Sequence, residues 1–199
     1  MKQGYLKISA LFLLVAVVLI ACNTAADSKQ AAEDSNDAKF SEKDTLSNST
    51  SPVLEKDADF AVSAADGGRM EVELGNLAQR NAGSSSVKDF GMMMVQDHSK
   101  ANDELRALAV QKGITLPDSL SNKKRKKYEE LSSLKGNRFD EEYISFMVSD
   151  HKEDIELFQQ YVNEGSNNDL LQWASGKIST LNRHLQHALK ADSIINKSK

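Results

Sequence analysis

The chain reads Met94-Val95-Gln96-Asp97-His98 near its middle, and the same pattern returns as Met147-Val148-Ser149-Asp150-His151. Each copy lies in a segment whose apolar residues are three or four positions apart, which is the spacing of one face of an α-helix. Both histidines belong to that apolar face, one turn after a methionine. The repeat therefore predicts two long helices that each bring a histidine into a protein core.

The same periodicity predicts two further helices, so that four long helices cover about residues 53–82, 86–112, 138–163 and 167–195. Residues 113–136 form a longer connection with a short accessory helix, whereas the other two connections are short turns. Inside the first helix, Gly67-Gly68 predicts a kink or a close contact with another helix. A long middle connection lets the second and third helices run parallel. The sequence therefore predicts an all-α, ferritin-like four-helix bundle over residues 52–195.

The first 22 residues have the pattern of a bacterial lipoprotein signal. Lys2 and Lys7 form a positively charged region before an apolar run, residues 8–21, that is too short for a typical transmembrane helix. The run ends in Leu19-Ile20-Ala21-Cys22, which resembles a lipobox and implies cleavage after residue 21 and lipidation of Cys22. Cys22 is the only cysteine, so no intramolecular disulfide is available to it. We expect a signal peptide over residues 1–21 and a lipid anchor that holds the mature protein at a membrane.

Residues 22–51 have the composition of an anchor followed by a flexible tether. Ser, Asn, Asp, Ala and Lys dominate this stretch, and Phe40 and Leu46 are its only large apolar residues. Such a stretch buries too little apolar surface to offset the entropy lost on ordering.

The net charge of −4 and the single basic run at residues 123–127 give no sign of a nucleic-acid surface. The basic run is typical of a solvated helix face, and the alternative is a contact with anionic lipid headgroups. The predicted partner is therefore a membrane, reached through the lipid anchor, and not a nucleic acid.

Four polar residues should meet at one level of the bundle. His98 and His151 lie at similar distances from the starts of their helices. Glu71 and His184 lie at similar distances from the ends of the first and fourth helices, which run in the opposite direction. The predicted site therefore consists of Glu71, His98, His151 and His184.

Several stretches carry a specific combined pattern, at residues 60–75, 87–91, 94–105, 136–140 and 184–185. Together they resemble the bacterial family called domain of unknown function 4142, over about residues 55–190. The resemblance implies an outer-membrane or exported protein with a ferritin-like helical bundle and no established activity. For this lipid-anchored chain we expect the outer membrane, with the bundle facing the periplasm. The resemblance also implies polar residues at the four positions of the predicted site.

A di-iron centre of the ferritin type is not predicted. Such centres use two Glu-x-x-His motifs and two further carboxylates. The residues three positions before the four histidines are Val95, Val148, Leu181 and His184, and none of them is acidic. We therefore expect neither a ferroxidase nor an oxygen-activating di-iron enzyme.

Three imidazoles and one carboxylate can instead hold one divalent transition metal, such as zinc, copper, iron or manganese. Met94 and Met147, one turn before two of the histidines, would suit a softer ion such as copper(I), and their alternative role is packing of the core. The alternative for the histidines is a buried polar cluster, bonded to Glu71 and to one another without a ligand.

Neighbouring polar residues are assigned no chemistry. Asp97 and Asp150 should point away from the adjacent histidines and pair with Arg or Lys, and His187 should be exposed. The sequence has no nucleophile motif and no phosphate-binding glycine loop. The leading interpretation is therefore a metal-binding or sensing lipoprotein rather than a turnover enzyme. The alternatives are a structural or interaction bundle with an architectural polar core and, third, an unusual metal-dependent enzyme.

Overall fold

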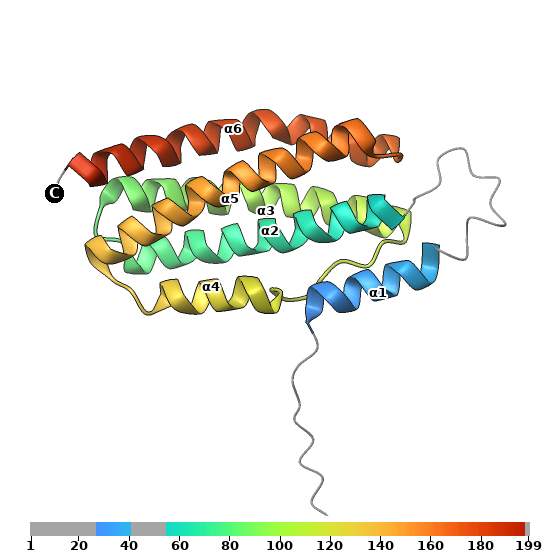
Figure 1. The fold of residues 1–199 in the computed structure, drawn as a ribbon, viewed down its shortest axis with the longest axis horizontal. Coiled ribbons are helices and arrows are strands. Elements are labelled where there is room, and N and C mark those ends of the chain that lie inside the picture. The colour runs from blue at the N-terminus through green and yellow to red at the C-terminus, as the bar shows by residue number, and fades with distance from the viewer. Residues whose placement is uncertain (1–26, 41–54, 198–199) are drawn as a thin grey trace, which may run out of the picture.

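Four long helices form a bundle in the computed structural model of the chain, which describes residues 27–40 and 55–197 (Figure 1). The four helices of the bundle are α2 Glu55–Asn81, α3 Ser85–Lys112, α5 Gly136–Glu164 and α6 Asn168–Lys197. Two shorter helices, α1 Ser28–Phe40 and α4 Asn122–Ser132, accompany them. Within these ranges no helix is long and apolar enough to cross a bilayer. The predicted signal peptide, Cys22 and much of the predicted tether lie outside the described residues.

The connections set the direction of each helix. α2 and α3 form one antiparallel hairpin, α5 and α6 form a second, and α4 lies in the long connection between them (Figure 1). α2 also packs on α5, and α3 packs on α6, so α3 and α5 lie at opposite corners of the bundle. Figure 1 shows that α3 and α5 run in the same direction. The predicted all-α four-helix bundle with a long crossover is therefore confirmed, with the repeat on two parallel helices.

One polar level divides the apolar core into two clusters of buried side chains. On α3, Met94 belongs to the first cluster and Leu105 to the second. On α5, Met147 belongs to the first cluster and Phe158 to the second. His98 and His151 lie between these residues and hence between the clusters. Each large apolar side chain that is fully buried stabilises the fold by about 1.5–3 kcal/mol. The apolar packing on both sides therefore fixes the height at which the polar residues meet.

Two buried carboxylates tie the hairpins to each other. Asp140, in the first turns of α5, accepts hydrogen bonds from the backbone N–H groups of Gly83 and Ser84, at 3.1 and 2.8 Å. Asp57, in the first turn of α2, accepts one from the backbone N–H of Asn167, at 3.2 Å. Each hairpin turn is thus held by a carboxylate of the other hairpin, and the two hairpins cannot slide along one another without breaking these bonds.

Glycines let α2 and α3 come close together. A Cβ added to Gly75 would lie 2.5 Å from the carbonyl oxygen of Gly91, and a Cβ on Gly68 would lie 2.1 Å from Asn102 Oδ1. Both distances are far shorter than van der Waals contact, so a larger side chain at Gly75 would push the backbones of the two helices apart, and one at Gly68 would displace the Asn102 amide. The close helix contact predicted from Gly67-Gly68 is confirmed at Gly68. It brings Glu71, one turn further along α2, within reach of α3.

α1 shows that the prediction of a flexible tether over residues 22–51 is wrong for residues 28–40, which form a helix docked on the bundle. Its buried residues, Ala32, Asn36 and Phe40, are four positions apart and so lie on one face. Asn36 Nδ2 donates to the Thr115 carbonyl at 2.9 Å, and the Thr115 N–H donates to Asn36 Oδ1 at 2.7 Å. Composition averages over the whole stretch, whereas docking depends on these few residues meeting a distant loop.

Candidate metal centre

The four predicted site residues lie together at the polar level of the bundle. Glu71 is on α2, His98 on α3, His151 on α5 and His184 on α6, and all four are buried. The centroids of the three imidazole rings are 5.1, 5.4 and 5.9 Å apart. His98 Nδ1 is 2.7 Å from Glu71 Oε2, and His151 Nε2 is 3.4 Å from Glu71 Oε1. Glu71 therefore contacts two histidines with its two carboxyl oxygens.

A chain of hydrogen bonds connects Asp97 to Glu71. Burial alone would raise the pKa of Asp97, but hydrogen bonds from His184 and Arg183 hold it below its usual value. Asp97 is therefore ionised and accepts from His184 Nε2–H at 2.8 Å. Burial lowers the pKa values of His184 and His98 to about 4, so both rings are neutral at pH 7.

The ionised Asp97 and the two neutral rings determine where the protons lie on His184, His98 and Glu71. A neutral His184 that donates from Nε2 must accept at Nδ1, so His98 Nε2–H donates to it over 3.2 Å. His98 Nδ1 then carries a lone pair, and its 2.7 Å contact with Glu71 Oε2 requires a proton on the carboxyl. Burial raises the pKa of Glu71 to about 8, in agreement with a protonated carboxyl at pH 7.

His151 lies outside this chain. Its Nδ1–H donates to the Met147 carbonyl at 3.0 Å, and burial lowers its pKa to about 4, so Nε2 carries a lone pair. That lone pair faces Glu71 Oε1, the carboxyl oxygen without the proton. No N–H or hydroxyl donor in the described part of the chain bonds to either atom. Two buried acceptors that face each other in this way are unfavourable unless a cation or a water hydrogen lies between them.

Three carboxyl groups and one lysine meet beside His151, on what we call the carboxylate side of the site. Asp150 is buried, and Asp154, one turn later on α5, lies within hydrogen-bonding range of Glu71. Carboxylates this close cannot all be ionised without a cation. Burial raises the pKa of Asp150, and burial beside the carboxyl groups of Glu71 and Asp150 raises that of Asp154. Lys124 Nζ lies 3.7 Å from Asp150 Oδ1; burial opposes its charge, but the carboxylates outweigh burial and raise its pKa.

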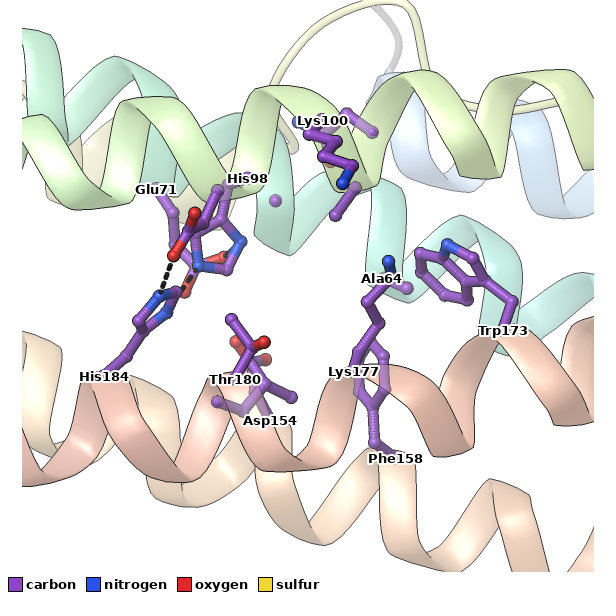
Figure 2. Close-up of a pocket in the computed structure, with 15 residues that line it drawn as sticks. Ala64, Glu71, His98, Lys100, Asp154, Phe158, Trp173, Lys177, Thr180 and His184 are labelled. Carbon is purple, nitrogen blue, oxygen red and sulfur yellow. Dashed lines mark hydrogen bonds and ion pairs between the residues drawn. The ribbon is translucent and has the colours of Figure 1, made fainter.

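A pocket of about 140 Å³ reaches the site. Figure 2 shows His98 and His184 facing each other at one end of this pocket, with Trp173 and Lys177 at the other end. Asp154 lies between these two ends (Figure 2). The volume exceeds by several fold the roughly 15 Å³ needed for one water molecule. The pocket can therefore admit a hydrated ion or a small molecule to His98, His184 and Glu71.

The two methionines predicted as soft ligands lie elsewhere. Met94 and Met147 are fully buried in one of the two apolar clusters and do not line the pocket. Packing of the core is the role that this placement supports for both side chains.

The predicted ion pairs of the two aspartates are present. Asp97 pairs with Arg183 over 2.7 Å, and Asp150 pairs with Lys124. His187 is exposed, as predicted. Asp150, however, was expected on the solvent-facing flank of α5, and this part of the prediction is wrong. Asp150 is buried, because α2 and α4 cover that face of α5.

Two residues of the site were missed in the sequence. Asp154 follows Asp150 by four positions, and two acids at that spacing share one helix face, which was a usable signal. Lys124 gave no such signal, because it belongs to the basic run that was expected to be solvated. It reaches the core only because α4 lies against α2 and α5.

Residues 42–191 match the model of the family described as Domain of unknown function (DUF4142). The chain belongs to this family. The match includes every residue of the candidate centre, whereas α1 of this DUF4142 protein precedes it. The resemblance drawn from the sequence motifs is thereby confirmed.

A solved structure gives the same fold. It is the crystal structure of a DUF305 fragment from Deinococcus radiodurans, with a TM-score of 0.63 and 9% sequence identity. The alignment covers 73% of the DUF4142 chain and 99% of the other chain. At this identity the likeness shows the helical fold alone. None of the curated proteins is significantly similar in sequence.

Proposed function

We propose that this DUF4142 protein is a metal-binding or sensing module of the bacterial cell envelope. One divalent transition metal, such as zinc, iron, manganese or copper, would be held among Glu71, His98, His151 and His184. The chain would be anchored through a lipid on Cys22 to the outer membrane, with the bundle in the periplasm. It would act by binding rather than by turnover.

One observation supports the metal above all others. His151 Nε2 and Glu71 Oε1 are buried acceptors that face each other across 3.4 Å, with no N–H or hydroxyl donor for either in the described chain; the carboxyl of Asp154 lies within hydrogen-bonding range of Glu71. Zinc bonds to nitrogen and oxygen are about 2.0–2.2 Å long, which puts tetrahedral ligand atoms about 3.4 Å apart. His98, His151 and His184 also offer ring nitrogens within 4.8 Å of one another. Because ligands bind metal in the deprotonated form, binding would release the proton of Glu71.

A structural bundle without a ligand is the second candidate. The hydrogen-bond chain from Asp97 through His184 and His98 to Glu71 favours it, since a fully satisfied buried network is stable on its own. His151 distinguishes the two functions, because its Nε2 takes no part in that chain.

The test compares His151→Gln with His187→Gln, which changes an exposed histidine on α6. Full-length protein in detergent is stripped with a chelator and titrated with zinc, manganese, iron(II) or copper. Wild type and His187→Gln should bind one equivalent. At a free metal concentration of about 100 Kd, stability should rise by about 2.7 kcal/mol, which is about 5–10 °C in Tm. His151→Gln should lose most of this response. Wild type that binds none of the metals, with an unchanged Tm, would leave only the structural bundle.

A further inference from the structure

We propose that the metal binds on the carboxylate side of the site, to Glu71, Asp150 and His151, and that the Lys124 ammonium is the cation it displaces. This inference rests on the proposed metal-binding function. It adds a ligand, a class of metal and an internal competitor to that function.

Three residues of α2 and α5 each carry a buried atom that receives no N–H or hydroxyl hydrogen bond. The atoms are Glu71 Oε1, Asp150 Oδ2 and His151 Nε2, and no N–H or hydroxyl group among residues 27–40 and 55–195 bonds to them. Glu71, Asp150 and His151 each offer one ligand atom within 4.8 Å of those of the other two. By contrast, the ring nitrogens of His98 and His184 already have partners. A metal at these residues leaves the hydrogen bonds from His98 to His184 and from His184 to Asp97 in place and costs only the Glu71 proton with its bond to His98, so the first ion should bind there.

The ligand set indicates the class of metal. Two carboxylates and one imidazole suit manganese(II), iron(II) or zinc(II), whereas copper(I) prefers thiolates and thioethers. Asp154 adds a third carboxylate against Glu71, which increases the negative charge around the ion. The thioethers of Met94 and Met147 are packed in the apolar cluster and contribute nothing to a soft site.

Lys124 supplies the positive charge of the metal-free site. Its ammonium lies 3.7 Å from Asp150 Oδ1, and it would lie 3.9 Å from a Cβ added to Gly67. The ammonium thus lies against α2 at Gly67, beside the carboxylates of α5. An ammonium and a divalent ion a few ångströms apart repel each other, so the two cations compete for the same carboxylates.

Lys124 has a route out of the site. Its side chain is 21% exposed, and it lines a groove of about 860 Å³ that also touches Asp150, Asp154 and residues of α1. The flexible lysine side chain can rotate into this groove, where water solvates its charge. Metal binding would therefore move Lys124 from the core to the groove beside α4.

The test uses full-length protein in detergent, with manganese(II) and zinc(II) titrated separately in a calorimeter. Asp150→Asn keeps the shape of the side chain and removes its charge, so affinity should fall by about tenfold or more. Lys124→Met removes the competitor and should raise affinity by about tenfold. Lys126→Met, an exposed lysine on the same helix, should leave affinity unchanged.

Amine labelling of wild type gives a second readout that needs no variant. Acetylation of Lys124, followed by mass spectrometry, should become several-fold faster once metal is bound, while acetylation of Lys126 stays constant. Wild type that binds metal with Asp150→Asn at full affinity, or with Lys124 labelling unchanged by metal, refutes this inference and leaves the proposed function intact. Failure of both wild type and Lys124→Met to bind zinc, manganese, iron(II) or copper refutes the proposed function itself.

Discussion

Glu71→Gln should make the metal-free protein more stable and at the same time abolish its response to metal. Glu71 keeps its proton at pH 7, because burial raises its pKa to about 8. A glutamine has nearly the same shape, and its amide can donate to His98 Nδ1 as the carboxyl proton does. The amide is also a far weaker metal ligand than a carboxylate.

The magnitude follows from the pKa. In the unfolded chain Glu71 loses its proton near pH 4.5, whereas the folded protein keeps it up to about pH 8. Each pH unit in this window costs the folded state about 1.4 kcal/mol, or roughly 3 kcal/mol at pH 7. Stability that is present below pH 4.5 is thus lost as the pH rises toward 8. The glutamine variant avoids this loss, so its Tm at pH 7 should be higher by roughly 5–10 °C.

The assay is thermal unfolding in the presence of a chelator, between pH 4.5 and 8.5. Glu156→Gln makes the same chemical change at an exposed position of α5 and serves as the control. The advantage of Glu71→Gln should vanish near pH 4.5 and grow with pH. A variant that is less stable than wild type at pH 8 would contradict the reasoning, because it would mean that Glu71 is ionised and paired with a charged histidine.

Three further predictions concern the anchor and the packing. Cys22→Ser should leave the bundle folded and release the protein from membranes; a soluble wild type without lipid mass on its N-terminus would contradict this. Asp140→Ala removes the acceptor of two backbone N–H groups and should destabilise the fold by about 1–3 kcal/mol, with faster hydrogen exchange at Gly83 and Ser84. Asn36→Ala should detach α1, so that protease cleaves residues 28–40 while the Tm of the bundle changes little; continued protection would show that the Asn36–Thr115 bonds are dispensable.

The sequence was sufficient for the fold because its strongest signals are periodic. The apolar faces define four helices, and the lengths of the connections determine which helices run parallel. The repeat could then predict that His98 and His151 lie at one height, because a helix rises by a constant distance per residue. The heights of Glu71 and His184 could be predicted in the same way, by counting residues back from the ends of the first and fourth helices, which run in the opposite direction.

The repeat could not predict what lies beside each histidine. Its copies lie on α3, the second helix of one hairpin, and on α5, the first helix of the other. Asp97 and Asp150 are therefore equivalent in sequence but meet different neighbours: Asp97 faces α6 and bonds to His184, whereas Asp150 meets Lys124 of α4. Such neighbours are set by the packing of whole helices, and no local pattern contains that information.

At the polar level, the polar atoms of His98 and His184 have hydrogen-bond partners, whereas some of those on the carboxylate side lack them. This difference supports the proposed ligand. A cluster that served the fold alone would be bonded throughout, as His98 and His184 are. On the carboxylate side, Glu71, Asp150 and His151 each keep a buried acceptor without an N–H or hydroxyl donor from the described chain. Apolar residues of similar volume would spare the protein the cost of burying these groups, since replacing buried charged groups in this way is often neutral or stabilising. Groups that weaken the metal-free fold at one position, while the adjacent histidines are fully bonded, support the proposed cation site.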